Sequence, residues 1–425
     1  MGCFDNLVAK IKSVSSGTKN QEKNPANDTL KNTPAPAEKN KMAEQQPINA
    51  DATPQTLTIA LQNKSSHSDA YAYVTGLAIN NNNRYSFIQA DGRTVYTPAS
   101  PSQTGAPLGA DVAIPLGAPG STKNVTIPRL AGGRIWFSFG SKLTFKLNPG
   151  PGIVEPSVNN PSDPNININW CFTEFTFNDY QLFVNLSYVD FIGNIPIAIA
   201  ITNTAGQVKS SPGMSANGFN TVVSELRAQT SRDGRPWDRL IYSPGGNPLR
   251  ALSPNNLLVS DGNAWGNYWD AYVNQVWSKF QSQDLTINTQ AGAGNLTGRV
   301  SNNLLSLGSA GTFSKPNAKD IFSCSTGPFQ TGDNGARNAV IPRLAAAFNR
   351  SVLLDTNQTP NGSNPGNYYK NATTNHYARI VHQVQKDGRG YAFPYDDVVP
   401  DGGSDVAGVL FDSNPTLWTV AVGGN

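Results

Sequence analysis

Two carboxylic acids in this sequence have the types and the spacing required for paired acid–base chemistry. Glu174 lies in the middle of an aromatic run, WCFTEFTFND at residues 170–179, and Asp190 lies near the end of the next run, YQLFVNLSYVDFI. Because a turn at NDY would fold the second run back beside the first, the two carboxyl groups can meet on neighbouring strands. One protonated and one ionised carboxyl group are what the cleavage of a glycosidic bond requires.

The setting of Glu174 indicates a use for its carboxyl group. Side chains alternate along a strand, which places Glu174, Thr176 and Asn178 on one face and Phe175 and Phe177 on the other. If the phenylalanines face the core, the opposite face is polar and lined with hydrogen-bonding groups, as the floor of a sugar-binding groove would be. The alternative is a two-sided strand that shows its polar face to water.

Asp190 is the candidate partner of Glu174, with one difficulty. It shares the alternation of Val184 and Leu186, which have the pattern of core residues, so a bulge or a strand end must turn its side chain toward Glu174. Asp179 is a rival carboxylate, but it falls in the expected turn. We expect the two carboxyl groups to lie farther apart than the distance of about 5 Å that is typical of retaining glycosidases.

The composition favours a turn-rich, largely β protein with a polar, uncharged surface. Only 14% of the 425 residues are charged, the net charge is +3, and glycine (39) and proline (30) are frequent. There is no basic run with interleaved aromatic residues, which argues against nucleic-acid binding. The three histidines and three cysteines lack metal-ligand spacing, so we expect structural histidines and no metal.

Residues 1–52 differ in kind from the rest of the chain. After MGCFDNLVAKIKSV, in which FDNLVAKIKSV could form a short amphipathic helix, too few large apolar residues follow to form a core, and we expect a disordered tail. The first residues suggest lipidation, with Gly2 myristoylated and Cys3 palmitoylated, two signals that together anchor a protein to a membrane. Asn6 stands where the myristoylation pattern has Ser or Thr, so an ordinary tail is the alternative.

Residues 53–205 have the pattern of a β domain. Runs such as QTLTIALQN, AYAYVTGLAI and IPIAIAITN are rich in β-branched and aromatic residues and are separated by turn residues. The segment RIWFSFGSKLTFKLNPGPG predicts a hairpin with its turn at GSK. Short strands at regular spacing suggest a β-sandwich or a barrel.

Residues 206–375 change to a mixed α/β pattern. Helices are expected at 217–230, 269–280 and 338–353, where apolar residues recur at spacings of three and four. The recurring residues of the second helix are largely aromatic, which predicts core packing or, alternatively, a platform for sugar rings. Residues 376–425 return to a strand pattern, so we expect the last strands to rejoin the β domain and leave a wide groove between the two parts.

Several strings spread over residues 55–422 resemble the glycoside hydrolase family 64 β-1,3-glucanases: YAYVTGLAINNNNRYSFIQADGR, LAGGRIWFS, LNPGPGIVEPSVNNPSDPNININW, TEFTFND and YVDFI. The resemblance implies a thaumatin-like β domain joined to a mixed α/β domain, with a wide groove that accepts a glucan helix. It also implies endo cleavage of laminarin- or curdlan-type glucan into short oligosaccharides, with inversion. Glu174 would be the catalytic acid and Asp190 the base, and no cofactor would be needed.

The resemblance suggests further residues along the groove. They are Asp163 in PSDPN, Thr176 and Asn178 in TEFTFND, and Asp396 and Asp397 in YDDV. Strand alternation adds Phe183 and Ser187 to this face, and Phe183 could stack against a sugar ring. From the residues alone, YDDVVPDGG could equally be an acidic turn.

Two other function classes remain open at this level: a thaumatin-like protein that binds glucan without cleaving it, and a membrane-tethered interaction protein that reuses the fold. The expected partner is β-1,3-glucan, and we expect a monomer. Members of the family are usually secreted, but the segment around Gly2 and Cys3 is not a hydrophobic export signal. We therefore favour the cytoplasm or the inner membrane face over secretion, with Cys171 and Cys324 as reduced thiols.

Overall fold

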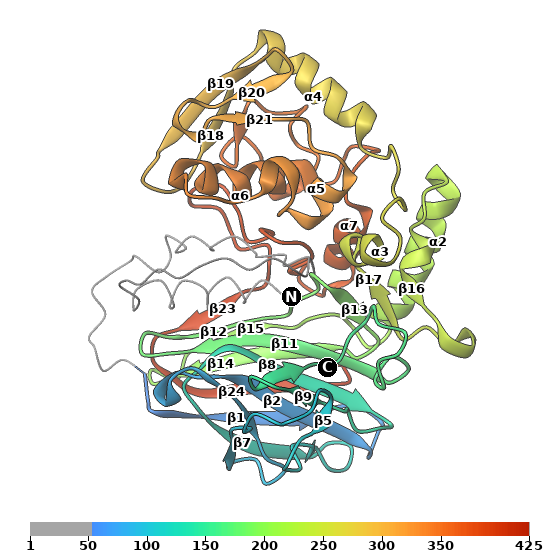
Figure 1. Cartoon of the computed structure of the whole chain (residues 1–425), viewed down its shortest axis with the longest axis vertical. Coiled ribbons are helices and arrows are strands. Elements are labelled where there is room, and N and C mark those ends of the chain that lie inside the picture. Colours follow the sequence, from blue (N-terminus) through green and yellow to red (C-terminus); the bar gives the residue numbers. More distant parts are fainter. Residues whose placement is uncertain (1–52, 425) are drawn as a thin grey trace.

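The computed structural model describes residues 53–424, which form two lobes (Figure 1). The lower lobe in that view is a β-sandwich, and the upper lobe combines helices with a small sheet. The candidate lipidation sites Gly2 and Cys3 and the expected amphipathic helix lie outside the described residues. None of the helices between residues 53 and 424 has the length and hydrophobicity needed to span a membrane.

Two open sheets form the sandwich. The first has the strand order β15 (Val208–Ser211), β14 (Ile197–Asn203), β24 (Pro415–Val422), β1 (Thr56–Asn63) and β7 (Thr122–Pro128). The second has the order β23 (Leu410–Asp412), β12 (Leu182–Asn185), β11 (Asn169–Phe177), β8 (Leu130–Phe139), β2 (Ala70–Ala78), β3 (Arg84–Ile88) and β4 (Val95–Tyr96), with β6 (Ile114–Pro115) also paired to β2. Because neither sheet closes on itself, the sandwich expectation is confirmed and the barrel alternative is wrong.

Alternating side chains build the core between the two sheets. In β14 the isoleucines Ile197, Ile199 and Ile201 are buried, while the residues between them are partly exposed. From the opposite sheet, the ring of Phe175 lies 5.1 Å from that of Trp418 on β24. Strand β15 pairs with β14 and extends the sandwich to Ser211, past the expected boundary at residue 205.

The hairpin expected at residues 134–152 is wrong. Strand β8 pairs with β2 on one side and β11 on the other. Strand β9 (Lys146–Asn148) instead lies between β10 (Gly152–Val154) and β5 (Ala106–Pro107) in a separate small sheet. A local turn signal was therefore outweighed by pairing between segments distant in the sequence.

The upper lobe contains α4 (Asp270–Ser282), α5 (Ala318–Ser323) and α6 (Gly335–Asn349) beside a sheet of short strands (Figure 1). The sheet order is β21 (Thr312–Phe313), β20 (Leu304–Ser306), β19 (Asn295–Ser301), β18 (Leu285–Asn288) and β22 (Gln358–Thr359). The aromatic stripe of α4 is buried throughout, which confirms core packing and excludes a sugar platform. Its buried members are Trp269, Tyr272, Val273, Val276, Trp277 and Phe280.

A third group of elements lies between the lobes at one side: α2 (Gly218–Asp233), α3 (Pro254–Ser260), α7 (His376–Val384) and the sheet β13 (Phe191–Gly193), β17 (Arg250–Leu252) and β16 (Ile241–Tyr242). The expectation of strands directly after residue 375 is wrong, because α7 comes first. Its sequence is amphipathic, and Asn375 caps its first turn by accepting a hydrogen bond from the amide of Ala378. Strands β23 and β24 then return to the sandwich.

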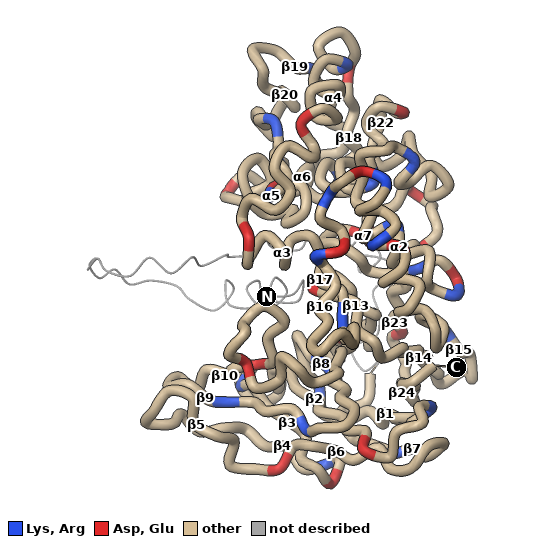
Figure 2. Tube along the Cα trace, turned by 90° about the vertical axis from the view of Figure 1, so that its right-hand side faces the viewer, with Lys and Arg blue, Asp and Glu red and all other residues tan. Residues whose placement is uncertain are grey.

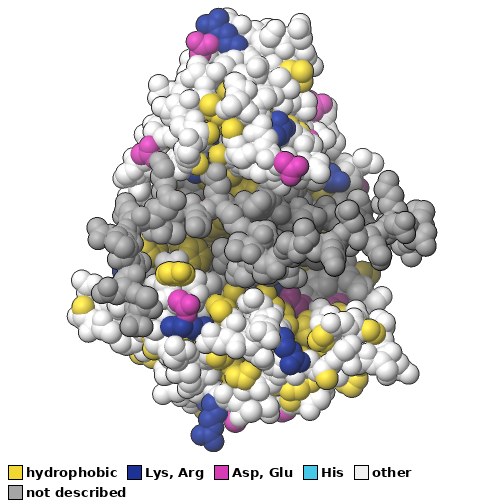
Figure 3. Space-filling view, turned by 60° about the vertical axis from the view of Figure 1, so that its left-hand side comes forward, with side chains coloured by type: hydrophobic (Ala, Val, Ile, Leu, Met, Phe, Trp, Pro, Cys, Tyr) yellow, Lys and Arg dark blue, Asp and Glu magenta, His cyan; other side chains and the backbone are white. Residues whose placement is uncertain are grey.

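The described surface carries few charges. Lys, Arg, Asp and Glu are dispersed over both lobes and gather into no single stripe among the described residues (Figure 2). On the face shown in Figure 3, uncharged side chains predominate, and apolar groups of the sandwich gather beside the waist between the lobes. Such a surface suits an uncharged ligand better than a polyanion.

Candidate active site

Glu174 occupies a central strand of the larger sheet. On β11 it pairs with Arg134 of β8 on one side and with Asn185 of β12 on the other. Phe175 and Phe177 point into the sandwich core and are fully buried, as the alternation predicts. Glu174 points to the opposite face but is only 1% exposed, so the alternative that this face meets bulk water is wrong.

The closest charged partner of Glu174 is Arg134. The Nε and Nη2 groups of Arg134 both donate to Oε1 of Glu174, at 3.3 Å each. The Nη1 group of the same guanidinium donates to Oε2 of Glu155 at 2.6 Å, and Glu155 accepts a further hydrogen bond from the hydroxyl of Tyr85. The guanidinium also packs against the rings of Trp136 and Phe172, at 5.4 and 4.9 Å from their centroids.

The environment of Glu174 favours its protonated form. Burial raises the pKa of this carboxyl group, and the nearby negative charge of Asp190 raises it further. The positive charge of Arg134 and the hydroxyl of Ser187 lower the pKa, but they do not cancel the effect of burial. Among the described residues, Oε2 of Glu174 has no hydrogen-bond partner, so this oxygen remains available to carry a proton.

Asp190 lies outside the regular strand, which removes the difficulty of its alternation. Strand β12 ends at Asn185, and residues 186–190 form an irregular segment before β13 begins at Phe191. The side chain is half-buried and acts electrostatically on both Glu174 and Arg134. The strand end anticipated from the sequence thus separates Asp190 from the core pattern.

The backbone around Asp190 is held from several directions. The amide of Ser253 donates to the carbonyl of Asp190 at 2.9 Å, and Nδ2 of Asn256 donates to the same oxygen at 2.7 Å. Both residues belong to the first turn of α3, where Ser253 is the N-cap. On the other side, the buried hydroxyl of Tyr377 on α7 donates to the carbonyl of Tyr188 at 2.6 Å. Elements outside the sandwich therefore position the candidate base.

Three of the other expected residues share the face of Glu174 or border it. Phe183 on β12 pairs with Thr176 on β11, so the two side chains lie side by side on that face. The hydroxyl of Thr176 accepts a hydrogen bond from the amide of Gly132, at 3.4 Å. Ser187 is buried just beyond the end of β12, and its backbone forms an isolated parallel β-bridge with Tyr391.

Asn178 and Asp163 have structural contacts. The expectation that Asn178 lies in the strand is wrong, because β11 ends at Phe177. Oδ1 of Asn178 accepts hydrogen bonds from the amides of Tyr180 and Gln181 in the turn. Asp163 is buried, and its two oxygens accept from the amides of Ser157 and Asn165. Their side-chain oxygens thus shape a turn and a loop, which leaves contact with a ligand as a prediction.

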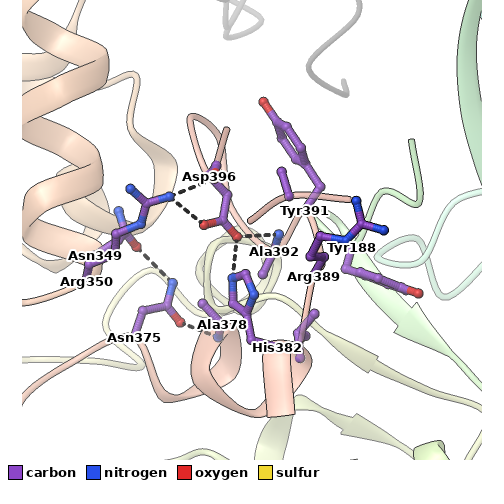
Figure 4. Close-up of polar contacts among 12 residues, drawn as sticks. Tyr188, Asn349, Arg350, Asn375, Ala378, His382, Arg389, Tyr391, Ala392 and Asp396 are labelled. Carbon is purple, nitrogen blue, oxygen red and sulfur yellow. Dashed lines mark hydrogen bonds and ion pairs between the residues drawn. The ribbon is translucent and has the colours of Figure 1, made fainter. Parts of the chain in front are cut away.

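Asp396 is the centre of a buried ionic cluster (Figure 4). It is 0% exposed; Oδ1 accepts from Arg350 at 3.0 Å, and Oδ2 accepts from His382 at 2.9 Å and from the amide of Ala392 at 2.9 Å. This geometry corrects the expectation that Asp396 lines a groove, because both of its oxygens are occupied inside the protein. Asp397 is half-buried and accepts a hydrogen bond from the hydroxyl of Tyr391.

The Asp396 cluster connects the upper lobe to the candidate site. Arg350 follows helix α6 and His382 lies on α7, whereas Ala392 and Tyr391 belong to the segment that bridges to Ser187. The carbonyl of Tyr391 also accepts from the amide of Tyr188, at 2.8 Å. Residues 391–398, which end in YDDV, are therefore fixed by the buried charges around Asp396 and, at Tyr391, by the backbone of Ser187 and Tyr188.

The sequence interpretation missed Arg134, Glu155 and Tyr85. Two signals were available: Arg134 is a charged residue within the apolar strand pattern RIWFSF, and Glu155 is one of three glutamates beyond residue 52. Neither signal gives the strand order, and only that order places β8 beside β11. The contacts among these residues could not be derived without it.

No metal site is evident among the described residues. Between residues 53 and 424, no three His, Cys, Asp or Glu side chains gather in a way that could hold a metal ion. Cys171 and Cys324 are both buried, and no disulfide joins them. Burial raises the pKa of the Cys171 thiol, which disfavours the reactive thiolate.

A buried carboxyl group and a second carboxylate lie on the outer face of a β-sandwich that is joined to an α/β lobe, and such a pair of carboxyl groups suits a glycoside hydrolase. Residues 55–422 match glycoside hydrolase family 64, the β-1,3-glucanases, and the chain belongs to this family.

Individual relatives agree with this assignment. A glucan endo-1,3-β-glucosidase of Cellulosimicrobium cellulans is 29% identical over 385 residues, which cover 85% of this chain and 66% of that protein. A protein of the same name from Arthrobacter sp. (strain YCWD3) is 28% identical over 399 residues, or 88% of this chain and 69% of that one. The chain thus spans about two thirds of the length of these relatives.

Solved structures share the whole architecture. The structure of a laminaripentaose-producing β-1,3-glucanase in complex with laminaritetraose superimposes with a TM-score of 0.76 at 32% identity, covering 87% of this chain and 98% of the other. A β-1,3-glucanase domain of family 64 from Clostridium beijerinckii has a TM-score of 0.66 at 21% identity, covering 89% of this chain and all of that domain. The second comparison shows the fold alone.

Proposed function

We propose that the chain hydrolyses β-1,3-glucan at internal linkages, with inversion, and releases short oligosaccharides. The observation that carries this proposal is the state of Glu174: a buried carboxyl group with a raised pKa, one oxygen without a protein partner among the described residues, and a second carboxylate, Asp190, nearby. Family membership and the relatives named above support the substrate class.

In this mechanism Glu174 is the general acid. Its proton passes to the glycosidic oxygen as the bond to C1 breaks, which avoids an alkoxide leaving group. Asp190, ionised, removes a proton from a water molecule that attacks C1 from the opposite face. A β-linkage then yields an α-configured product, and proton exchange with solvent returns both carboxyl groups to their starting states. No step requires a cofactor.

The remaining residues of the proposed site bind and orient the glucan. Thr176 and Phe183 lie on the face of Glu174, and Phe183 offers a ring against which a sugar could stack. Ser187, whose hydroxyl lowers the pKa of the acid, is also assigned to glucan binding, as are Asp163, Asn178 and Asp397. Asp396 acts at a distance by holding the segment that carries Tyr391.

The test is the release of reducing ends from laminarin or curdlan by the purified chain. Enzymatic cleavage predicts release of short oligosaccharides that increases with time. Binding to curdlan without any release would instead support the glucan-binding alternative, and neither binding nor release would reject the substrate class.

We also propose, from the sequence alone, a monomer attached peripherally to a membrane through Gly2 and Cys3. Metabolic labelling with a myristate analogue, in cells that express the chain, tests the anchor. A G2A variant serves as the control, and an unlabelled wild-type chain would reject the proposal. Size-exclusion chromatography with light scattering tests the monomer.

A further inference from the structure

One guanidinium is shared by two carboxyl groups, and the sharing is unequal. Arg134 approaches Glu155 to 2.6 Å, whereas its two contacts with Glu174 are 3.3 Å long. The shorter contact indicates that the positive charge is neutralised mainly by Glu155.

Glu155 is held where it can do this. It lies in the segment after β10, and its second oxygen accepts a hydrogen bond from the hydroxyl of Tyr85 on β3. Tyr85 on β3 and Arg134 on β8, two strands of the larger sheet separated by β2, therefore both anchor the carboxylate. The side chain of Glu155 is 28% exposed, so water reaches its carboxyl group, whereas Glu174 is 1% exposed and is closed off from solvent.

We propose that Glu155 is a positioning residue of the hydrolysis, which draws the charge of Arg134 away from Glu174 and thereby allows Glu174 to keep the proton it must donate. This inference rests on the proposed function of Glu174 as the acid. The shared guanidinium supplies the physical link between the two glutamates.

The charge balance of the cluster supports this role. With Glu174 protonated and Glu155 ionised, Arg134 and Glu155 form a neutral pair, and no unpaired charge is buried between them. Without a carboxylate at position 155, Glu174 would be the remaining ion-pair partner of the guanidinium among the described residues, and the general acid would be shifted toward its ionised form.

Several other groups around Glu174 also act on its carboxyl group, whether or not Glu155 is ionised. Ser187 and Asp190 act on it from the segment after β12, Arg134 acts on it from β8, and Asp190 in turn acts on Tyr377 of α7. Glu155 and Asp190 both act on the charge of Arg134, but of these two only Glu155 forms an ion pair with its guanidinium in the described structure, at 2.6 Å. The direction of the Glu174 pKa, which lies above its ordinary value, agrees with this competition.

The test compares the pH profiles of kcat/KM for wild type and E155Q on laminarin. The alkaline limb of the profile reports the acid that must be protonated. We expect this limb to move to lower pH in E155Q, with about a tenfold loss of kcat/KM on the alkaline side and little change on the acidic side. E155D, which keeps the charge, should retain the wild-type limb.

A matched control is E225Q. Glu225 lies on α2, outside the sheet that carries Glu174; it pairs with Arg232 at 3.2 Å and is 29% exposed, so the same substitution removes an ion pair from a glutamate of similar exposure. Its profile should be unchanged. A loss in E155Q that is equal at every pH would show a merely structural role and overturn the proposal.

The outcomes separate this inference from the proposed function. A wild-type chain that releases nothing from laminarin rejects the function, whereas an active wild type with an unshifted E155Q rejects only the role of Glu155. Titration of the Glu174 carboxyl by ¹³C NMR gives the same answer without activity: its midpoint should fall in E155Q. If E155Q fails to fold, Y85F replaces it, because this variant removes one anchor of Glu155. The titration midpoint of Glu174 should then fall by a smaller amount than expected for E155Q, and an unchanged midpoint would again overturn the proposal.

Discussion

Glu174 lies directly opposite Arg134 in the pairing of β11 with β8, and its Oε1 accepts two hydrogen bonds from that guanidinium, each 3.3 Å long. The acid is thus placed by the register of two central strands, which are rigid elements. Asp190 is placed differently, by hydrogen bonds from Ser253 and Asn256 to its backbone carbonyl. The sandwich holds the acid and the elements between the lobes hold the base, so the relative position of the two carboxyl groups depends on how those parts pack.

Replacing the acid gives the most direct prediction. Glu174→Gln removes the transferable proton and changes little volume, so turnover of laminarin should fall by about 10³-fold or more. Binding to curdlan, measured by sedimentation of the bound protein, should remain close to wild type. Turnover within tenfold of wild type would refute the assignment of Glu174 as the acid.

The stereochemistry of the product tests the role of Asp190. Inversion predicts that the first product detected by ¹H NMR carries the α-anomer at its new reducing end, because water attacks from the face opposite the leaving oxygen. An initial β-anomer would indicate a covalent intermediate and two displacements. Asp190→Asn should lower turnover by about 10²-fold or more, since the attacking water loses its base.

Ser187 offers a prediction of opposite sign to that for Glu155. Its hydroxyl lowers the pKa of Glu174 by stabilising the ionised form. Ser187→Ala should therefore raise that pKa and move the alkaline limb of the kcat/KM profile to higher pH, with a loss of kcat smaller than about tenfold. A limb that stays in place would mean that the hydroxyl does not act on the acid.

Local patterns in the sequence were sufficient to predict which side chains of a strand or helix are buried. The face of Glu174 follows from the alternation with Phe175 and Phe177, and the buried stripe of α4 follows from helical spacing. Helix α7 was missed although its pattern is equally local, with Tyr377, Ile380, Val381 and Val384 buried on one side. In that case the return to strands, which begins only at Leu410, was placed too early.

Contacts between distant segments could not be predicted from local patterns. The expected hairpin at GSK failed because β8 is flanked by β2 and β11, a choice set by packing across the whole sheet. The partnership of Arg134 with Glu155 and Glu174 depends on the same strand order. Likewise, burial of Asp396 between Arg350 and His382 requires α6, α7 and the YDDV segment to converge, and YDDV alone gives no sign of this.

The Asp396 cluster predicts a specific dependence of stability on pH. Burial alone would lower the pKa of His382, but the charge of Asp396 and hydrogen bonds to Asp396 and the Gly388 carbonyl raise it above its ordinary value. A group whose pKa is raised on folding adds stability below its unfolded pKa of about 6.5 and loses it as pH rises through the folded pKa. Burial alone would raise the pKa of Asp396, but His382 and Arg350 lower it, so its contribution is lost only as pH falls through that lowered value.

The wild type should therefore have a free energy of unfolding about 3 kcal/mol higher than that of a His382→Gln variant in the mildly acidic range. This range, between the lowered pKa of Asp396 and about 6.5, is where the difference between the two proteins should be largest. The margin should shrink as pH rises past the folded pKa of His382, because the neutral imidazole no longer pairs with the carboxylate. Urea unfolding at a series of pH values measures it. His67→Gln is the control: His67 lies 3.4 Å from Asp69 with 47% of its side chain exposed, against 14% for His382, and a pair so open to solvent contributes little. A margin for His382→Gln that stays constant with pH, or that grows toward alkaline pH, would show that His382 is not held as an imidazolium in the folded protein.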